Sequence, residues 1–113
     1  MKIDDILKKD SIIANLAGTN KEEVLREITG FLQELGLIKD KEILFNTLME
    51  REKLGSTGIG ENVAIPHGKS DELSQIVTVF GRSSNGVDFE SLDQKPVHFV
   101  CLVTAPSNST GQH

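Results

Sequence analysis

The chain has 113 residues, of which 37% are apolar and 26% are charged, and this composition suits one small globular domain with a core. Its net charge of -5 argues against nucleic acid as the main partner, because no excess of Lys and Arg is available to neutralise phosphates. Cys101 is the only cysteine, which excludes an intrachain disulfide. The polar first residues do not resemble a signal peptide, and no apolar run approaches the length of a membrane span. We therefore expect a cytoplasmic protein without direct membrane insertion.

The first strong pattern predicts a helix over residues 21–35. Its apolar side chains recur with a helical period and form one stripe, which consists of Val24, Ile28, Phe31, Leu32 and Leu35. Asn20 is placed to cap the first turn, and Glu23 stands where a capping-box carboxylate reaches back. Gly36 can end the helix in a left-handed conformation.

A second helix is predicted over residues 41–53. Asp40 is its expected cap, and Gly55 follows its end. The buried face is expected to comprise Leu44, Phe45, Leu48 and Met49.

Strands are predicted over residues 62–66, 76–81 and 97–104, with a shorter extended piece over residues 11–16. Asn85-Gly86 is a turn signal between the last two strands. The last strand is apolar on both faces, a pattern typical of a strand inside a sheet that is covered on both sides. Two helices ahead of three strands predict an α/β or α+β layered fold with a mixed sheet flanked by helices.

The residues after the last strand contain too little helix to cover its second face. We therefore expect that further residues follow His113, or that a second chain supplies the cover. An uncovered apolar face would favour self-association.

One histidine, His67, lies between Pro66 and Gly68 at the expected carboxyl end of a strand. Proline restricts the local backbone and glycine leaves the outer side of the ring uncrowded, so the imidazole could act as a nucleophile in phosphoryl transfer. The alternative is a structural histidine bonded to a backbone carbonyl. From the residues alone, the two interpretations are about equally favoured.

Two neighbouring features fit a phosphate site, but each has a simpler explanation. Arg51 could grip phosphate oxygens with its planar guanidinium, although position alone favours a surface arginine stabilised by the end of a helix. The loop 55–60 could cradle an oxyanion or could merely connect a helix to a strand. Its glycine order, G-x-x-G-x-G after a helix, argues against a nucleotide-binding loop.

The other candidates have less support. His98 falls inside a predicted strand and is expected to be structural, and His113, the last residue, gains no role from its spacing. The three histidines lack metal-ligand spacing, and Cys101 follows a core pattern, so neither a metal nor a cofactor is expected.

Two adjacent runs together resemble the signature of a known family. Residues 50–60 read Glu-Arg-Glu-Lys-Leu-Gly-Ser-Thr-Gly-Ile-Gly, and residues 63–69 read Val-Ala-Ile-Pro-His-Gly-Lys. The runs are similar to the type-2 IIA domains of the phosphoenolpyruvate-dependent sugar phosphotransferase system. This is the fructose/mannitol class, which includes the nitrogen-regulatory IIA proteins. Residues 86–93 and 96–99 also fit the class.

The resemblance implies an activity and a set of site residues. His67 would accept a phosphoryl group on Nε2 from the histidine-containing phosphocarrier protein and pass it to a cysteine of a IIB domain. Alternatively, it would hold the group as a regulatory mark that controls binding to a target protein. His113 would be an auxiliary histidine, and the phosphate would be bound by Arg51 together with Gly55, Ser56, Thr57 and Gly58. Residues 1–113 would form a single such domain that lacks the C-terminal helices of the family.

Overall fold

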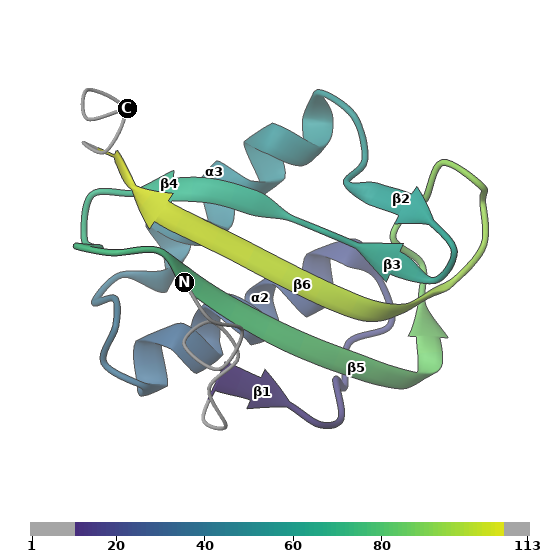
Figure 1. Ribbon diagram of the computed structural model, residues 1–113, viewed down its shortest axis with the longest axis horizontal. Helices are drawn as coiled ribbons and strands as arrows, with labels where there is room; N and C mark the ends of the chain where they lie inside the picture. Colours follow the sequence, from purple (N-terminus) through teal and green to yellow (C-terminus); the bar gives the residue numbers. More distant parts are fainter. Residues whose placement is uncertain (1–10, 108–113) are drawn as a thin grey trace.

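Residues 11–107 are described in the computed structural model of the chain (Figure 1). It contains the helices α2 (Lys21–Glu34) and α3 (Lys41–Lys53) and the strands β1 (Ile12–Ile13), β2 (Gly58–Gly60), β3 (Val63–Ala64), β4 (His67–Ser70), β5 (Val77–Val87) and β6 (Val97–Pro106). The sheet order is β1-β5-β6-β3-β2, and β4 also pairs with β6. The pairs β1–β5, β3–β6 and β4–β6 are parallel, whereas β5–β6 and β2–β3 are antiparallel. The predicted mixed sheet with two helices is therefore confirmed.

Both helices begin where their caps predict. The Asn20 side chain accepts a hydrogen bond from the Glu23 N–H, and Asp40 accepts one from Glu42. The Glu23 carboxylate does not return to the cap residue. It accepts bonds from the N–H and hydroxyl of Thr19 instead, and these lower the pKa of Glu23. The start of α2 is thus held from both sides of its cap.

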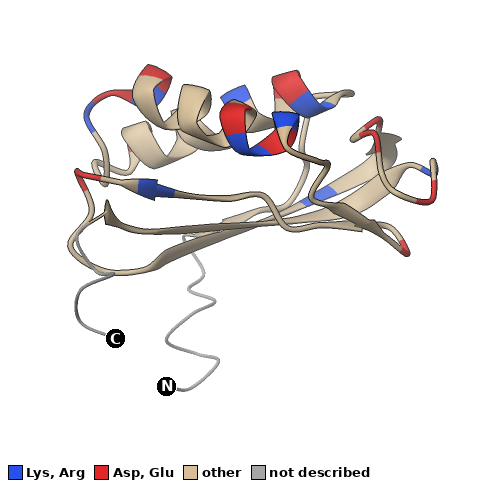
Figure 2. Ribbon diagram, turned by 90° about the horizontal axis from the view of Figure 1, so that it is seen from above, with Lys and Arg blue, Asp and Glu red and all other residues tan. Residues whose placement is uncertain are grey.

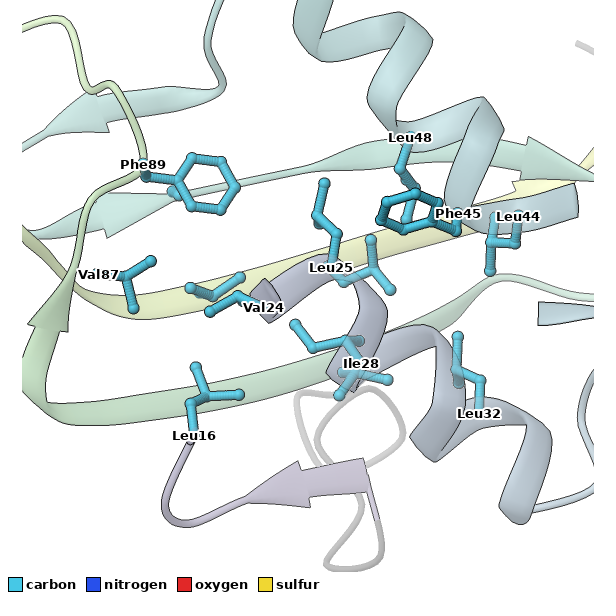
Figure 3. Close-up of a cluster of buried hydrophobic side chains, with 14 of the residues drawn as sticks. Leu16, Val24, Leu25, Ile28, Leu32, Leu44, Phe45, Leu48, Val87 and Phe89 are labelled. Carbon is cyan, nitrogen blue, oxygen red and sulfur yellow. The ribbon is translucent and has the colours of Figure 1, made fainter. Parts of the chain in front are cut away.

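The two helices lie on the same face of the sheet (Figure 2). The core fills the space between these two layers, and Figure 3 shows side chains of α2 and α3 directed toward the strands. Its fully buried members include Val24, Leu25, Ile28 and Leu32 from α2, Leu44 and Leu48 from α3, and Val79, Val100 and Leu102 from the sheet.

The second face of β6 is also apolar, as predicted. Phe99 alternates with the buried residues of the strand and is 39% exposed. Its ring centroid lies 6.0 Å from that of Phe80 on β5. Within residues 11–107, no helix covers this face. Self-association through it stays a prediction.

The strand that was expected over residues 62–66 is interrupted. β3 and β4 both run parallel to β6 with the same offset, and Ile65 and Pro66 lie between them. Proline has no N–H to donate to the ladder, although its carbonyl accepts a bond from Val103. The prediction that His67 ends a strand is therefore wrong, because His67 begins β4.

The turn that was expected at Asn85-Gly86 is also wrong. Both residues lie inside β5, at an irregularity where the register against β6 shifts between Arg82 and Val87. The connection to β6 comes later, after residue 87. Gly86 adopts a positive φ, as it would in a turn, but a bulge can accommodate this conformation within a strand. The strand therefore continues past Asn85-Gly86.

Candidate active site around His67

The close packing of β4 against α3 brings His67 near the end of that helix. A Cβ atom on Gly68 would lie 3.1 Å from Leu48 Cδ2 and 3.2 Å from Thr47 Cγ2, both on α3. A side chain at this position would therefore crowd the helix, and glycine allows the close approach. We expected Gly68 to leave the imidazole uncrowded, but the space that it provides is occupied by α3.

The two ring nitrogens of His67 have different partners. Nδ1 lies 3.1 Å from the carbonyl oxygen of Ile65, and Nε2 lies 3.3 Å from Nε of Arg51. A carbonyl oxygen only accepts, and the Arg51 Nε–H only donates. The neutral tautomer with hydrogen on Nδ1 satisfies both contacts and leaves the lone pair on Nε2. The ring is exposed, so an incoming group can approach it.

Arg51 is held from a second side by the loop that follows α3. Its Nη1 donates to the carbonyl oxygen of Gly55 over 2.8 Å. Within residues 11–107, no carboxylate lies within ion-pair distance of this guanidinium. The structure thus brings together Arg51, Gly55 and His67, and the arginine charge beside Nε2 remains available to an anion.

The other predicted loop residues direct their polar groups into the protein. The Ser56 hydroxyl donates to the carbonyl of Phe89 and accepts from the Gly58 N–H. Thr57 donates to the Glu52 carboxylate from both its N–H and its hydroxyl. Direct phosphate binding by Ser56, Thr57 and Gly58 stays a prediction. Their observed bonds hold the loop in place beside Arg51.

The remaining histidines and the cysteine lie elsewhere. Nδ1 of His98 is 3.0 Å from Oδ1 of Asn62, which agrees with a structural role. Cys101 is partly buried on β6, and this burial raises the pKa of its thiol. His113 lies outside the described residues. Among residues 11–107, no three His, Cys, Asp or Glu side chains are grouped to hold a metal ion.

Sequence reasoning missed a buried ion pair behind the site. Nζ of Lys21 lies 3.1 Å from Oε1 of Glu52, the residue that follows Arg51. The two residues are 31 positions apart in the sequence. No local sequence pattern predicts such a pair, because only the packing of α2 against α3 brings the two residues together.

The arrangement suits the transfer of a phosphoryl group to an exposed, oriented imidazole. Residues 5–113 match the family model described as "Phosphoenolpyruvate-dependent sugar phosphotransferase system, EIIA 2". The chain belongs to this family. None of its helices within residues 11–107 has the length and apolar character to cross a membrane.

Two relatives show the range of this EIIA family. The chain is 38% identical over 113 residues to the PTS system fructose-specific EIIABC component of Bacillus subtilis, and the match covers 100% of the chain but 18% of that protein. It is 37% identical over 113 residues to a nitrogen regulatory protein of Bradyrhizobium diazoefficiens, covering 100% of the chain and 73% of the relative.

Solved structures agree with the EIIA fold. Nitrogen regulatory protein IIA-Ntr of Neisseria meningitidis superposes with a TM-score of 0.82 at 36% identity, covering 98% of the chain and 75% of that protein. Enzyme IIAMtl of Escherichia coli, solved in complex with phosphorylated enzyme IIBMtl, superposes with a TM-score of 0.75 at 27% identity, covering 94% of the chain and 74% of that protein.

Proposed function

We propose that the chain is a phosphoryl carrier of the phosphoenolpyruvate-dependent phosphotransferase system, and that Nε2 of His67 receives the phosphoryl group. One observation carries this proposal. The bond from Nδ1 to the Ile65 carbonyl leaves the ring's lone pair on Nε2, where it accepts the Nε–H of Arg51. The histidine-containing phosphocarrier protein is the proposed donor, and a IIB domain is the proposed acceptor.

In the proposed reaction, the Nε2 lone pair attacks the phosphorus of the donor's phosphohistidine. A new N–P bond forms as the donor's N–P bond breaks, and the donor imidazole leaves with the bonding electron pair. The Arg51 Nε–H, which Nε2 accepts before the reaction, turns to the phosphoryl oxygens, and the guanidinium stabilises their charge. The hydrogen on Nδ1 stays bonded to the Ile65 carbonyl, which favours the positive charge that the phosphorylated ring acquires.

Transfer onward follows the same logic. A IIB cysteine thiolate attacks the phosphorus, and the neutral His67 ring leaves in its original tautomer. The solved complex of enzyme IIAMtl with phosphorylated enzyme IIBMtl supports a IIB partner, because IIAMtl shares the fold of this chain. His113 stays in the proposal as an auxiliary histidine on the family resemblance alone. We also propose a cytoplasmic location, with which the single unpaired cysteine agrees.

A second candidate function is regulatory. Its support is the 37% identity to a nitrogen regulatory protein, with 100% of the chain and 73% of that protein aligned. In such a regulatory role, phosphorylation of His67 would change the affinity for a target protein. Binding that depends on phosphorylation, without transfer to any IIB cysteine, would favour this role.

The test of the phosphoryl site is His67→Ala with His98→Gln as a matched control. In both residues Nδ1 has a nearby oxygen partner, the carbonyl oxygen of Ile65 for His67 and Oδ1 of Asn62 for His98, but only the ring of His67 also contacts Arg51. We expect acid-labile labelling from phosphoenolpyruvate, enzyme I and the phosphocarrier protein to vanish in the first variant and persist in the second. Undiminished labelling of His67→Ala would refute the assignment.

A further inference from the structure

Lys21 and Glu52 form a buried ion pair. Neither residue contacts the side chains of His67 or Arg51 through a described hydrogen bond or ion pair. The Lys21 side chain is 9% exposed and that of Glu52 is 2% exposed. Removing two charges from water is costly and often gives no net gain in stability. A buried pair beside a candidate site therefore raises the question of what its geometry holds in place.

Glu52 connects the start of α2 to the loop after α3. Its Oε1 faces Lys21 and also accepts the Thr57 N–H over 3.0 Å, while its Oε2 accepts the Thr57 hydroxyl. Thr57 is itself buried. Successive helical residues point about 100° apart, so Arg51 can face the site while Glu52 faces the interior.

Two chains of hydrogen bonds lead from this loop to the site. The Thr57 carbonyl accepts the N–H of Ile65 over 3.0 Å, and the Ile65 carbonyl is the partner of His67 Nδ1. The Gly55 carbonyl, two residues before Thr57, holds the Arg51 guanidinium. The positions of the imidazole and the guanidinium therefore both depend on the loop 55–58, which Glu52 holds through its bonds to Thr57.

We propose that Glu52, oriented by Lys21, is a positioning residue for phosphoryl transfer and acts through Thr57. The inference rests on the proposed function of His67. Glu52 takes no proton and forms no bond to phosphorus. It fixes the Ile65 carbonyl so that His67 keeps hydrogen on Nδ1 and a lone pair on Nε2. When this hold is lost, the ring also samples the tautomer with hydrogen on Nε2, which cannot attack.

Other contacts of Lys21 support a positioning role for the pair. Its Nζ lies 5.4 Å from the centroid of the Phe89 ring and 3.6 Å from Oε2 of Glu90. The Phe89 carbonyl accepts the Ser56 hydroxyl, so residues on both sides of Lys21 bear on the same loop. Lys21 thus contacts two residues, Glu52 and Phe89, that each bond a residue of the loop 55–58.

The test uses Thr57→Val, which removes the hydroxyl but keeps the N–H and the approximate shape. Thr57→Ser is the rescue variant because it restores the hydroxyl. The matched control is Thr29→Val, since the Thr29 hydroxyl is also buried but bonds only carbonyls of its own helix. Ring 15N chemical shifts of His67 report the tautomer, and the initial rate of acid-labile labelling reports the transfer.

We expect Thr57→Val to shift the His67 tautomer population and to slow labelling by about 10-fold or more, since misplacement of about 1 Å can cost 100-fold. Thr57→Ser and Thr29→Val should keep the parent's tautomer and rate. Glu52→Gln, which keeps an acceptor but loses the charge facing Lys21, should show the same defect as Thr57→Val where it folds.

A parent-like tautomer and rate in Thr57→Val would overturn the proposal, as would an equal loss in Thr29→Val. The tautomer measurement needs no phosphoryl donor. If the parent chain takes no label, the phosphoryl-carrier function is refuted. A tautomer shift in Thr57→Val and not in Thr57→Ser would still show that Glu52 and Thr57 position the His67 ring.

Discussion

Replacing Arg51 by lysine would remove one half of a two-point contact while keeping the positive charge. The guanidinium places Nε 3.3 Å from Nε2 of His67 and Nη1 2.8 Å from the Gly55 carbonyl oxygen. These two nitrogens belong to one rigid plane. A lysine ammonium is a single point on a flexible stem and cannot hold both positions at once.

The size of the effect follows from the bonds that the guanidinium would make to the phosphoryl oxygens. A hydrogen bond to a charged group contributes about 1.5–3 kcal/mol. Because about 1.36 kcal/mol of activation free energy corresponds to a tenfold change in rate, losing one such bond to the phosphoryl oxygens should slow transfer roughly 10- to 150-fold. Arg51→Gln also loses the charge and should fall at or beyond the slower end of this range.

The assay is the initial rate of acid-labile labelling by the phosphorylated carrier protein under single-turnover conditions. Lys53→Gln is the control, because it removes a positive charge from the same end of α3. The described partner of Lys53 is Glu50 and not His67. It should stay within about twofold of the parent rate, as expected for an exposed pair of little energetic weight. Transfer by Arg51→Lys at the parent rate would refute the two-point argument, and an equal loss in Lys53→Gln would show that net charge alone matters.

The other predictions concern stability. Gly68→Ala should lower the free energy of unfolding in urea by about 1–3 kcal/mol, because its methyl group would crowd α3. Gly30→Ala meets open space and should raise the same free energy by up to about 1 kcal/mol. The reverse order of the two variants would contradict the packing argument. The N–H groups of Lys95 and Glu61 lower the pKa of Asp93 below its ordinary value of 3.8, so its contribution to stability is present above that pH and is lost as the pH falls through the lowered pKa. Asp93→Asn should therefore have a lower melting temperature than the parent at pH 7, and the two curves should converge in acid; a constant difference at all pH values would exclude this linkage.

Local patterns were sufficient for the helices. The caps at Asn20 and Asp40 are confirmed, because they involve residues a few positions apart that short-range geometry decides. Val24, Ile28 and Leu32 of the predicted stripe are buried, whereas Leu35 lies after the end of α2 and is 39% exposed. The signature around Arg51 and His67 was equally readable, because its residues form two short runs. That signature led to the family, although position alone had favoured a plain surface role for the arginine.

The strands were less predictable because their partners lie elsewhere in the chain. Gly68 and Lys69 have little preference for strands, yet they pair with Thr104 and Ala105 of β6. The glycine after Asn85 looked like a turn, but pairing between β5 and β6 absorbed it as an irregularity. In both places the sheet supplied hydrogen bonds that outweighed the local signal.

By itself, the sequence determined the two helices and the two-faced central strand, and its family resemblance singled out Arg51 and His67 as candidate site residues. Only the tertiary structure decided which partner each ring nitrogen of His67 has and what supports Arg51. Those outcomes depend on Ile65, Thr57 and Glu52, and Glu52 in turn meets Lys21 from another helix. Hydrogen bonds and ion pairs act over about 3 Å, so their partners are known only once the folded chain has brought distant residues together.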